Sequence, residues 1–169
     1  ASERAWDGLH TLHGAMGSHV APDDVYLGLR GLRTLSVRLE RHQRNTFAVL
    51  GWLKDQPRIA NIRYPGVDTD PGHRIWQRDF SGASGLCAFD FDAGTTREQA
   101  NTFLNALSLF GLGYSWGGFE SLAIPVKLKG SRSVIPIDES LCSVRLHIGL
   151  EDPEDLINDL KQALGKAFG

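Results

Sequence analysis

Apolar and polar residues alternate most regularly between Leu141 and Leu150, near the end of the chain. Apolar side chains occupy every second position, and polar or small ones occupy the positions between. The apolar set is Cys142, Val144, Leu146, Ile148 and Leu150, and the polar set is Ser143, Arg145, His147 and Gly149. A period of two is typical of a strand with one buried face. Weaker alternation over 84–92 and short apolar runs at 59–64 and 121–126 predict three more strands.

Helical spacing marks several of the remaining segments. A pattern that begins at Asp23 and ends before Pro57 predicts a long helix, either broken near Gly28 or Gly31 or crossing between two domains. The stripe expected on one face of it consists of Leu35, Leu39, His42, Thr46, Val49, Leu50 and Leu53. Residues 1–22 show only weak periodicity and are predicted to be a connecting segment.

Two further helices have ends that the sequence indicates. Thr96 and Gln99 form a capping-box pattern, and Gly111 is suited to end the helix that follows. Asp152 and Pro153 begin the last helix as an N-cap and a first-turn proline. The apolar stripe of that helix is Leu156, Ile157, Leu160 and Leu164. Short strands with one polar face, together with these helices, predict an α+β fold with a small antiparallel-type sheet covered by helices.

Composition narrows the class of protein. The 169 residues are 41% hydrophobic and 22% charged, with a formal net charge of −2. No cluster of Lys and Arg lies along one face, so we expect neither nucleic acid nor a membrane surface as a partner. No apolar stretch approaches the ~20 residues of a membrane helix, and the first residues lack the apolar core of a signal peptide. We expect a cytoplasmic protein in which Cys87 and Cys142 are buried free thiols, although a disulfide between them is possible.

Arg145 is the first candidate for chemistry. It lies in the middle of the clearest strand, on the face opposite the apolar positions. Its planar guanidinium could hold a carboxylate through two parallel hydrogen bonds. A solvated arginine, or one paired with a nearby acidic residue, is the structural alternative.

The second candidate is a glycine-rich loop between a predicted helix and a predicted strand. Gly111, Gly113, Gly117 and Gly118 surround the three side chains of Tyr114, Ser115 and Trp116. A tight turn with its aromatic side chains in the core would explain the same pattern. The order of helix, loop and strand is the reverse of a dinucleotide-binding fingerprint.

Four motifs in this order resemble the cystathionine γ-synthase and β-lyase family of pyridoxal-phosphate (PLP) enzymes. They are Gly31-Leu32-Arg33-Thr34-Leu35 with Arg38, Gly82-Ala83-Ser84-Gly85, Glu120-Ser121-Leu122 after Gly117-Gly118, and Arg145. Tyr114-Ser115-Trp116 is similar to the bacterial cystathionine β-lyase branch. The resemblance implies the C-terminal part of a fold-type I enzyme. Residues 1–28 would be the tail of the large PLP-binding domain and a linker, and residues 29–169 the C-terminal domain.

The resemblance also implies roles. Arg145 would bind the α-carboxylate of an amino acid substrate, Ser115 would assist it, and Tyr114 and Trp116 would shape the pocket. The implied reaction is β-elimination of cystathionine to homocysteine, pyruvate and ammonia, with PLP as the electron sink, in a homotetramer when the protein is full length.

The family's PLP lysine lies in a Ser/Thr-rich segment, and none of the five lysines here has that setting. They are Lys54, Lys127, Lys129, Lys161 and Lys166. We therefore expect PLP to be bound by an N-terminal region outside this chain, and the chain alone to have no catalytic or cofactor-binding residue and no activity. A non-catalytic α+β module that binds amino acids or mediates assembly is the alternative.

Other polar residues are weaker candidates. His10, His13 and His19 lack a carboxylate at a matching spacing, so solvated histidines are expected there rather than a metal site. His147 shares a strand face with Arg145, either as support for the site or as an ordinary polar position. Paired carboxylates at Asp90 and Asp92 could serve acid–base chemistry, but the end of a strand explains them more simply.

Overall fold

A computed structural model describes residues 2–126 and 141–169. Residues 127–137, predicted to be a polar connection, lie outside the described part. The chain divides into two compact units, residues 1–36 and 37–169.

The first unit is helical. Helix α1 covers Glu3–Met16 and α2 covers Pro22–Arg33, and neither helix buries a residue. The Ser2 hydroxyl caps the start of α1, and Gly17 ends it in the left-handed region at φ 60°. The segment predicted to be a connection therefore contains a regular helix with both ends capped.

The predicted long helix is two helices. α2 ends at Arg33, because its C-cap Thr34 has φ −113° and ψ 7°, outside the helical region, and α3 covers Leu35–Leu53. The predicted break near Gly31 is therefore present, and it falls at Thr34. Part of the predicted stripe is confirmed, since α3 buries His42, Asn45, Thr46, Val49, Leu50 and Leu53. The first two positions of the stripe, Leu35 and Leu39, are exposed instead.

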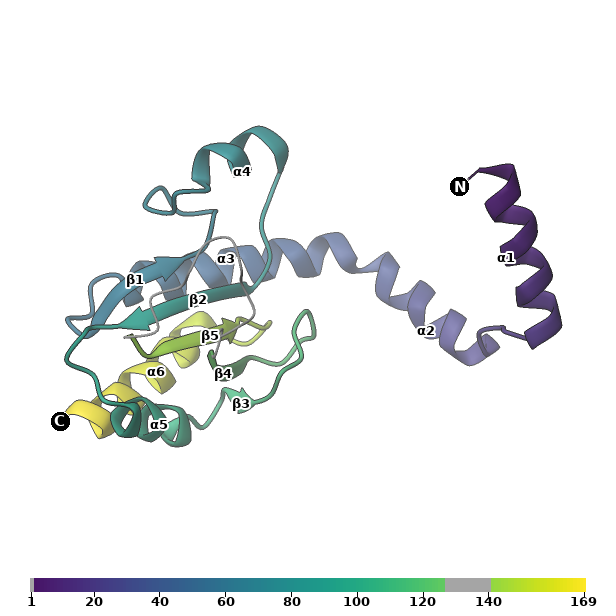
Figure 1. Ribbon diagram of the computed structural model, residues 1–169. Coiled ribbons are helices and arrows are strands. Elements are labelled where there is room, and N and C mark those ends of the chain that lie inside the picture. Colours follow the sequence, from purple (N-terminus) through teal and green to yellow (C-terminus); the bar gives the residue numbers. More distant parts are fainter. Residues whose placement is uncertain (1, 127–140) are drawn as a thin grey trace. The chain divides into compact units, whose positions relative to one another are not determined.

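The second unit is built on a five-stranded sheet with the order β1-β2-β5-β4-β3 (Figure 1). The strands are β1 Ile59–Arg63, β2 Leu86–Phe91, β3 Gly111–Leu112, β4 Leu122–Val126 and β5 Ser143–His147. All neighbouring strands are antiparallel except β3 and β4, which are parallel. The four predicted strands are confirmed. The two-residue β3 and the short helix α4, His73–Asp79, were not predicted.

Helix α5, Arg97–Ala106, begins with the predicted capping box of Thr96 and Gln99. The prediction that it ends at Gly111 is wrong. The carboxylate of Asp159 accepts hydrogen bonds from the amides of Ser108, Leu109 and Phe110 at 2.8–3.2 Å, which fixes the chain after Ala106 in a non-helical path.

Helix α6 covers Pro153–Phe168, and the Asp152 carboxylate caps it as predicted. Of its predicted stripe, Leu156 and Leu160 are fully buried, whereas Ile157 and Leu164 are partly buried.

One face of the sheet forms the core, against α3, α5 and α6 (Figure 1). Phe89 and Phe91 of β2 meet Phe103 of α5 edge to face, with ring centroids 6.1 and 5.3 Å apart. The other face carries polar side chains from adjacent strands, including Asp90, Ser143 and Arg145. This arrangement confirms the α+β class with a helix-covered, largely antiparallel sheet.

Candidate functional site

Strand β5 carries Arg145 on the polar face of the sheet. Its neighbours across the ladder are Ala88 on β2 and Ile124 on β4. Neither neighbour is charged, and Arg145 forms no ion pair with an acidic side chain in the described part of the chain, so the alternative of pairing with a nearby acidic residue is not observed there. The long side chain instead reaches the glycine-rich loop.

Arg145 contacts the backbone of that loop. Its Nη2 donates hydrogen bonds to the carbonyl oxygens of Tyr114 at 2.6 Å and Ser115 at 3.2 Å. Its Nε is buried and has no hydrogen-bond partner among the described residues. The guanidinium therefore lies against the loop. On the edge formed by Nε and Nη2, only Nη2 donates to acceptors among the described residues.

The loop between β3 and β4 exposes its aromatic side chains. Tyr114 is 79% exposed and Trp116 is 63% exposed, and Ser115 is also exposed. The alternative in which these aromatics fill the core is wrong. Gly117 adopts φ 83°, a conformation that favours glycine, where the loop turns back toward β4.

Glu151 and Gly149 hold the far end of the loop. Both oxygens of the Glu151 carboxylate accept hydrogen bonds from Ser121, one from its amide at 2.7 Å and one from its hydroxyl at 2.8 Å. The same hydroxyl accepts from the Gly149 amide at 2.8 Å. The amide of Leu150 donates to the Phe119 carbonyl at 2.9 Å. The loop that carries the candidate side chains is therefore tied to the residues directly after β5.

His147 lies beneath the same loop. His147 is only 2% exposed, and its Nε2 is 3.1 Å from the carbonyl oxygen of Gly118. Burial lowers the pKa of His147 below its ordinary value, and the neighbouring His42 acts in the same direction. The sequence offered His147 as either support or an ordinary strand residue, and the contact with the loop favours support.

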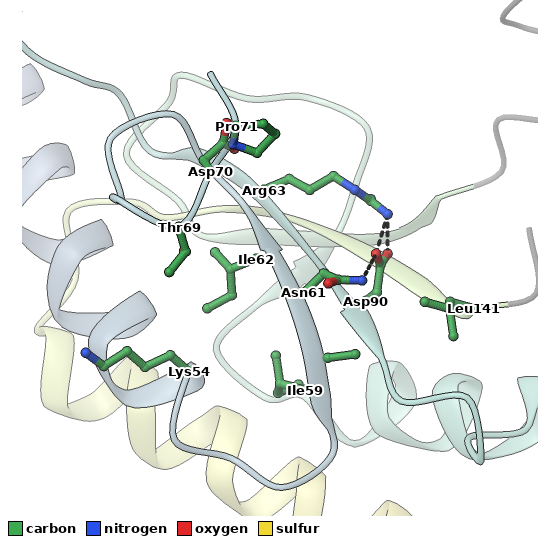
Figure 2. A pocket seen from close by; sticks show the side chains of 11 residues that line it. Lys54, Ile59, Asn61, Ile62, Arg63, Thr69, Asp70, Pro71, Asp90 and Leu141 are labelled. Atoms are coloured by element: carbon green, nitrogen blue, oxygen red, sulfur yellow. Dashed lines mark hydrogen bonds and ion pairs between the residues drawn. The ribbon is translucent and has the colours of Figure 1, made fainter. Parts of the chain in front are cut away.

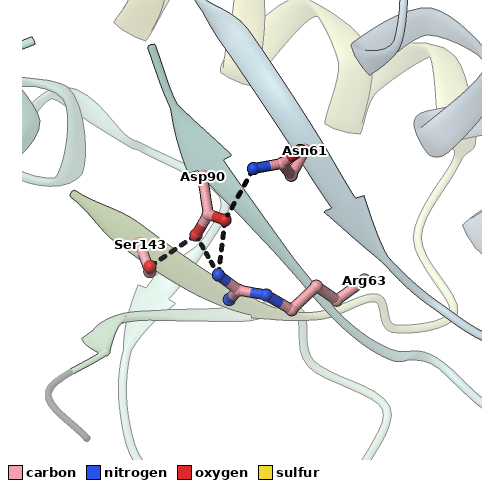
Figure 3. Close-up of polar contacts among 4 residues, drawn as sticks. All are labelled: Asn61, Arg63, Asp90 and Ser143. Atoms are coloured by element: carbon pink, nitrogen blue, oxygen red, sulfur yellow. Dashed lines mark hydrogen bonds and ion pairs between the residues drawn. The ribbon is translucent and has the colours of Figure 1, made fainter. Parts of the chain in front are cut away.

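A pocket of about 620 Å³ lies along the edge strand β1, lined by Lys54, Asn61, Arg63 and Asp90 among others (Figure 2). One of its charged lining residues, Asp90, is only 2% exposed. The Asp90 carboxylate accepts hydrogen bonds from Arg63, Asn61 and Ser143 (Figure 3). Three donors from the two flanking strands make Asp90 a link across the sheet.

The acid–base interpretation of Asp90 and Asp92 gains no support from the geometry. Asp92 lies outside this network and accepts hydrogen bonds from the Thr95 hydroxyl at 2.7 Å and from Arg58 at 3.2 Å. These donors, Thr95 first, hold the pKa of Asp92 below its ordinary range. The two carboxylates thus serve separate structural networks.

The remaining candidates lead to no further site in the described part of the chain. His10 and His13 lie on α1, and no group of three or more possible metal ligands occurs among the described residues. Cys87 and Cys142 are free thiols, as predicted, but only Cys87 of the two is fully buried, and Cys142 is partly buried. Burial raises the pKa of Cys87 to about 12. Among residues 2–126 and 141–169, no helix combines the length and apolar character that a membrane span requires.

Residues 1–165 match the family of Cys/Met metabolism PLP-dependent enzymes, so the chain belongs to that family. A cystathionine beta-lyase from Bordetella avium is 45% identical over 90% of this chain and 38% of its own. A cystathionine gamma-lyase from Homo sapiens is 41% identical over 94% of this chain and 40% of its own. Similarity extends to a racemase for alanine and glutamate from Wolbachia pipientis, at 39% identity. The chain therefore spans about two fifths of the length of these relatives.

A solved structure supports the fold. A putative O-acetylhomoserine (thiol)-lyase from Campylobacter jejuni, which contains a pyridoxyl-lysine phosphate residue, aligns with a TM-score of 0.73 at 34% identity. The alignment covers 89% of this chain and 34% of that one. The resemblance to the family, the fold class and PLP as the family's cofactor are thereby confirmed.

The lysines of the described part do not fit a PLP site. Lys54, Lys161 and Lys166 are all exposed, whereas a lysine that forms a Schiff base is typically desolvated. Lys127 and Lys129 lie outside the described residues. None of these three lysines therefore offers the desolvated amine that a PLP Schiff base requires.

Proposed function

We propose that this chain supplies the substrate-carboxylate side of the active site of a PLP-dependent carbon–sulfur lyase. The observation that carries the proposal is the contact of Arg145 with the loop of Tyr114, Ser115 and Trp116. It joins a guanidinium fixed on a rigid strand to a loop that presents a hydroxyl and two exposed aromatic rings. Such a combination suits a small zwitterion with an apolar or thioether side chain.

Arg145 would bind the α-carboxylate. The Nε–H and one Nη2–H of a guanidinium point the same way and can meet the two oxygens of a carboxylate together. Here Nη2 donates to loop carbonyls, and Nε is buried and has no partner within residues 2–126 and 141–169. A buried donor without a partner costs about 1–3 kcal/mol. A substrate carboxylate that displaced the loop carbonyls from this edge would recover that energy on binding.

The loop would complete the pocket. The Ser115 hydroxyl would assist in binding the carboxylate, and Tyr114 and Trp116 would shape the pocket and discriminate substrates. Their large exposed fractions support this role, because aromatic rings that fill no part of the core are available to cover a ligand.

Cystathionine is the proposed substrate and β-elimination the proposed reaction, giving homocysteine, pyruvate and ammonia. When bound, PLP serves as the electron sink that allows the thiolate to leave after the α-proton is removed. The residues of this chain would orient the substrate for that chemistry. The Tyr-Ser-Trp sequence of the loop favours the β-lyase branch, whereas the relatives include γ-lyases of nearly the same identity.

The organisation of the whole protein is part of the proposal. Residues 1–28 would belong to the large PLP-binding domain and its linker, and residues 29–169 would form the C-terminal domain. The full-length protein would be a cytoplasmic homotetramer. Alone, the 169-residue chain would be inactive.

The test uses the full-length protein that contains this chain. We expect visible absorption from bound PLP and release of pyruvate from cystathionine. Release of 2-oxobutyrate instead would identify γ-elimination, and racemisation of alanine without any keto acid would identify a racemase. A full-length protein that binds no PLP would overturn the proposal and favour the alternative of a non-catalytic amino-acid-binding or assembly module.

A further inference from the structure

The imidazole of His147 is enclosed by three separate segments. The first is the glycine loop, through Gly117 and Gly118. The second is Gly85, where an added Cβ would overlap the Ile148 carbonyl oxygen at 2.2 Å and would lie 3.2 Å from the His147 ring. The third is α3, whose His42 ring lies 5.2 Å from the His147 ring, centroid to centroid.

The contacts with the loop differ in geometry. Nε2 of His147 is 3.1 Å from the carbonyl oxygen of Gly118, which requires a proton on Nε2. The amide nitrogen of Gly117 is 3.3 Å from Nδ1 and 3.2 Å from Nε2. In the ring plane, an amide nitrogen this close to both Nδ1 and Nε2 would collide with Cε1, which lies between them. The amide must therefore lie above the face of the ring. The Gly117 N–H therefore points at the π face of the imidazole.

The neutral ring satisfies both contacts, and the protonated ring does not. In the neutral Nε2–H form, the ring donates to Gly118 and offers an electron-rich face to the Gly117 N–H. An imidazolium would keep the first contact but would repel the amide dipole over its face. Its added proton on Nδ1 would also have no acceptor among the described residues.

The surroundings of the ring as a whole also lower the pKa of His147. Burial is the largest cause of the lowered pKa of His147, and His42 and Arg145 act in the same direction. The Gly118 carbonyl and Glu151 oppose them. The ladder neighbours of His147, Leu86 on β2 and Leu122 on β4, contribute no charge.

His42 fixes the third side of the arrangement. Its Nδ1 donates to the Ile148 carbonyl at 2.7 Å, while its Nε2 is buried and without a partner among the described residues. His42 is therefore held next to His147 by the backbone of Ile148, the residue directly after β5.

We propose that His147 is a positioning residue whose neutral ring holds Gly117 and Gly118, and with them the Tyr114–Trp116 segment, against β5. Protonation of His147 loosens the loop and the surface that it forms beside Arg145. The consequence for substrate binding rests on the proposed function, whereas the consequence for the loop does not.

The sign of the pH effect follows from the lowered pKa. Because the folded state binds this proton less readily than the unfolded state, the contribution of the neutral ring is fully present above the ordinary histidine pKa of about 6.5. It is lost as the pH falls through the lower pKa of the folded state. Loop order should therefore decrease on acidification and be unaffected on the alkaline side.

The experiment is an NMR titration of the ¹⁵N-labelled 169-residue chain, which follows the His147 ring and the Gly117 and Gly118 amides. We expect ring and amides to share one midpoint below pH 6.5. In H147Q, whose side-chain amide can still donate to Gly118, the Gly117 and Gly118 amide signals should keep the chemical shifts that they have at neutral pH. These signals should no longer change as the pH falls. H73Q, which changes a histidine on α4, should leave both titrations intact.

Loop amides that titrate unchanged in H147Q would overturn the proposal. So would loop amides that do not move with the His147 ring before the chain unfolds. In the full-length protein, H147L should raise KM for the amino acid more than it lowers kcat, and H147Q should restore KM at neutral pH. Because the NMR result needs neither PLP nor turnover, failure of the proposed lyase activity would leave this test intact.

Discussion

Ser121 and Glu151 form a closed pair of hydrogen bonds, in which the amide and the hydroxyl of Ser121 each donate to a different oxygen of the Glu151 carboxylate. The same hydroxyl accepts from Gly149, so one side chain links the start of β4 to the end of β5. The glycine-rich loop is therefore held at its return to the sheet by Ser121, in addition to the contacts that Arg145 makes with its first half.

Removing that hydroxyl should destabilise the domain. S121A leaves the Gly149 amide and one Glu151 oxygen without a partner, and Ser121 is 1% exposed. We expect the free energy of unfolding to fall by about 1–3 kcal/mol, measured by denaturant titration. S115A removes the exposed hydroxyl of the same loop and should change it by less than about 0.5 kcal/mol. Equal losses in the two variants would show that the Ser121 link does not hold the loop.

Gly149 should not tolerate a side chain. An added Cβ would overlap the carbonyl oxygen of Phe119 and crowd the backbone of Glu120, where the loop packs on the end of β5. We expect G149A to lower the free energy of unfolding by about 1–3 kcal/mol, as in other overpacked sites.

Gly118 is the matched control for that change. It lies in the same loop, has nothing within 4 Å of an added Cβ and does not adopt a positive φ. Of these two glycines, only Gly149 would bring an added Cβ against backbone atoms. A G118A variant as unstable as G149A would therefore contradict close packing as the reason for the instability of G149A. Melting curves of the two variants recorded side by side would decide.

Asp159 should contribute to stability through the segment after α5. Its carboxylate accepts from three consecutive amides, and Asp159 is buried on α6. In D159N one oxygen becomes an NH₂ group that faces amide donors, so we expect a loss of about 1–3 kcal/mol. D155N, an exposed position one turn earlier on α6, should cost less than about 1 kcal/mol. Hydrogen exchange of the Ser108–Phe110 amides should quicken in D159N alone.

Local sequence patterns predicted much of the fold. The alternation in β5, the capping box before α5 and the Asp152 cap of α6 are each encoded within a few residues, and all three are confirmed. Contacts distant in sequence were not predictable in this way. The end of α5 depends on Asp159, about fifty residues further on, and β3 is only two residues long.

The candidate site was predictable only in part. Resemblance to a family brought Arg145 and the Tyr114–Trp116 loop together, and the structure places Arg145 against that loop. The register of β2, β5 and β1 places Asp90 among Arg63, Asn61 and Ser143, and no periodicity predicts such pairing. The same holds for the His147 ring beneath Gly117, because its partners come from three separate segments.

The most direct test of the central claim is the KM for cystathionine of the full-length protein with Arg145 replaced by alanine. Loss of a charge-assisted carboxylate clamp costs about 2–5 kcal/mol, so we expect kcat/KM to fall about 30-fold or more, chiefly through KM. R97A, which removes an exposed arginine on α5, should leave KM unchanged. An R145A protein that binds PLP normally and keeps the KM of the parent protein would contradict the assignment of Arg145 to the substrate carboxylate.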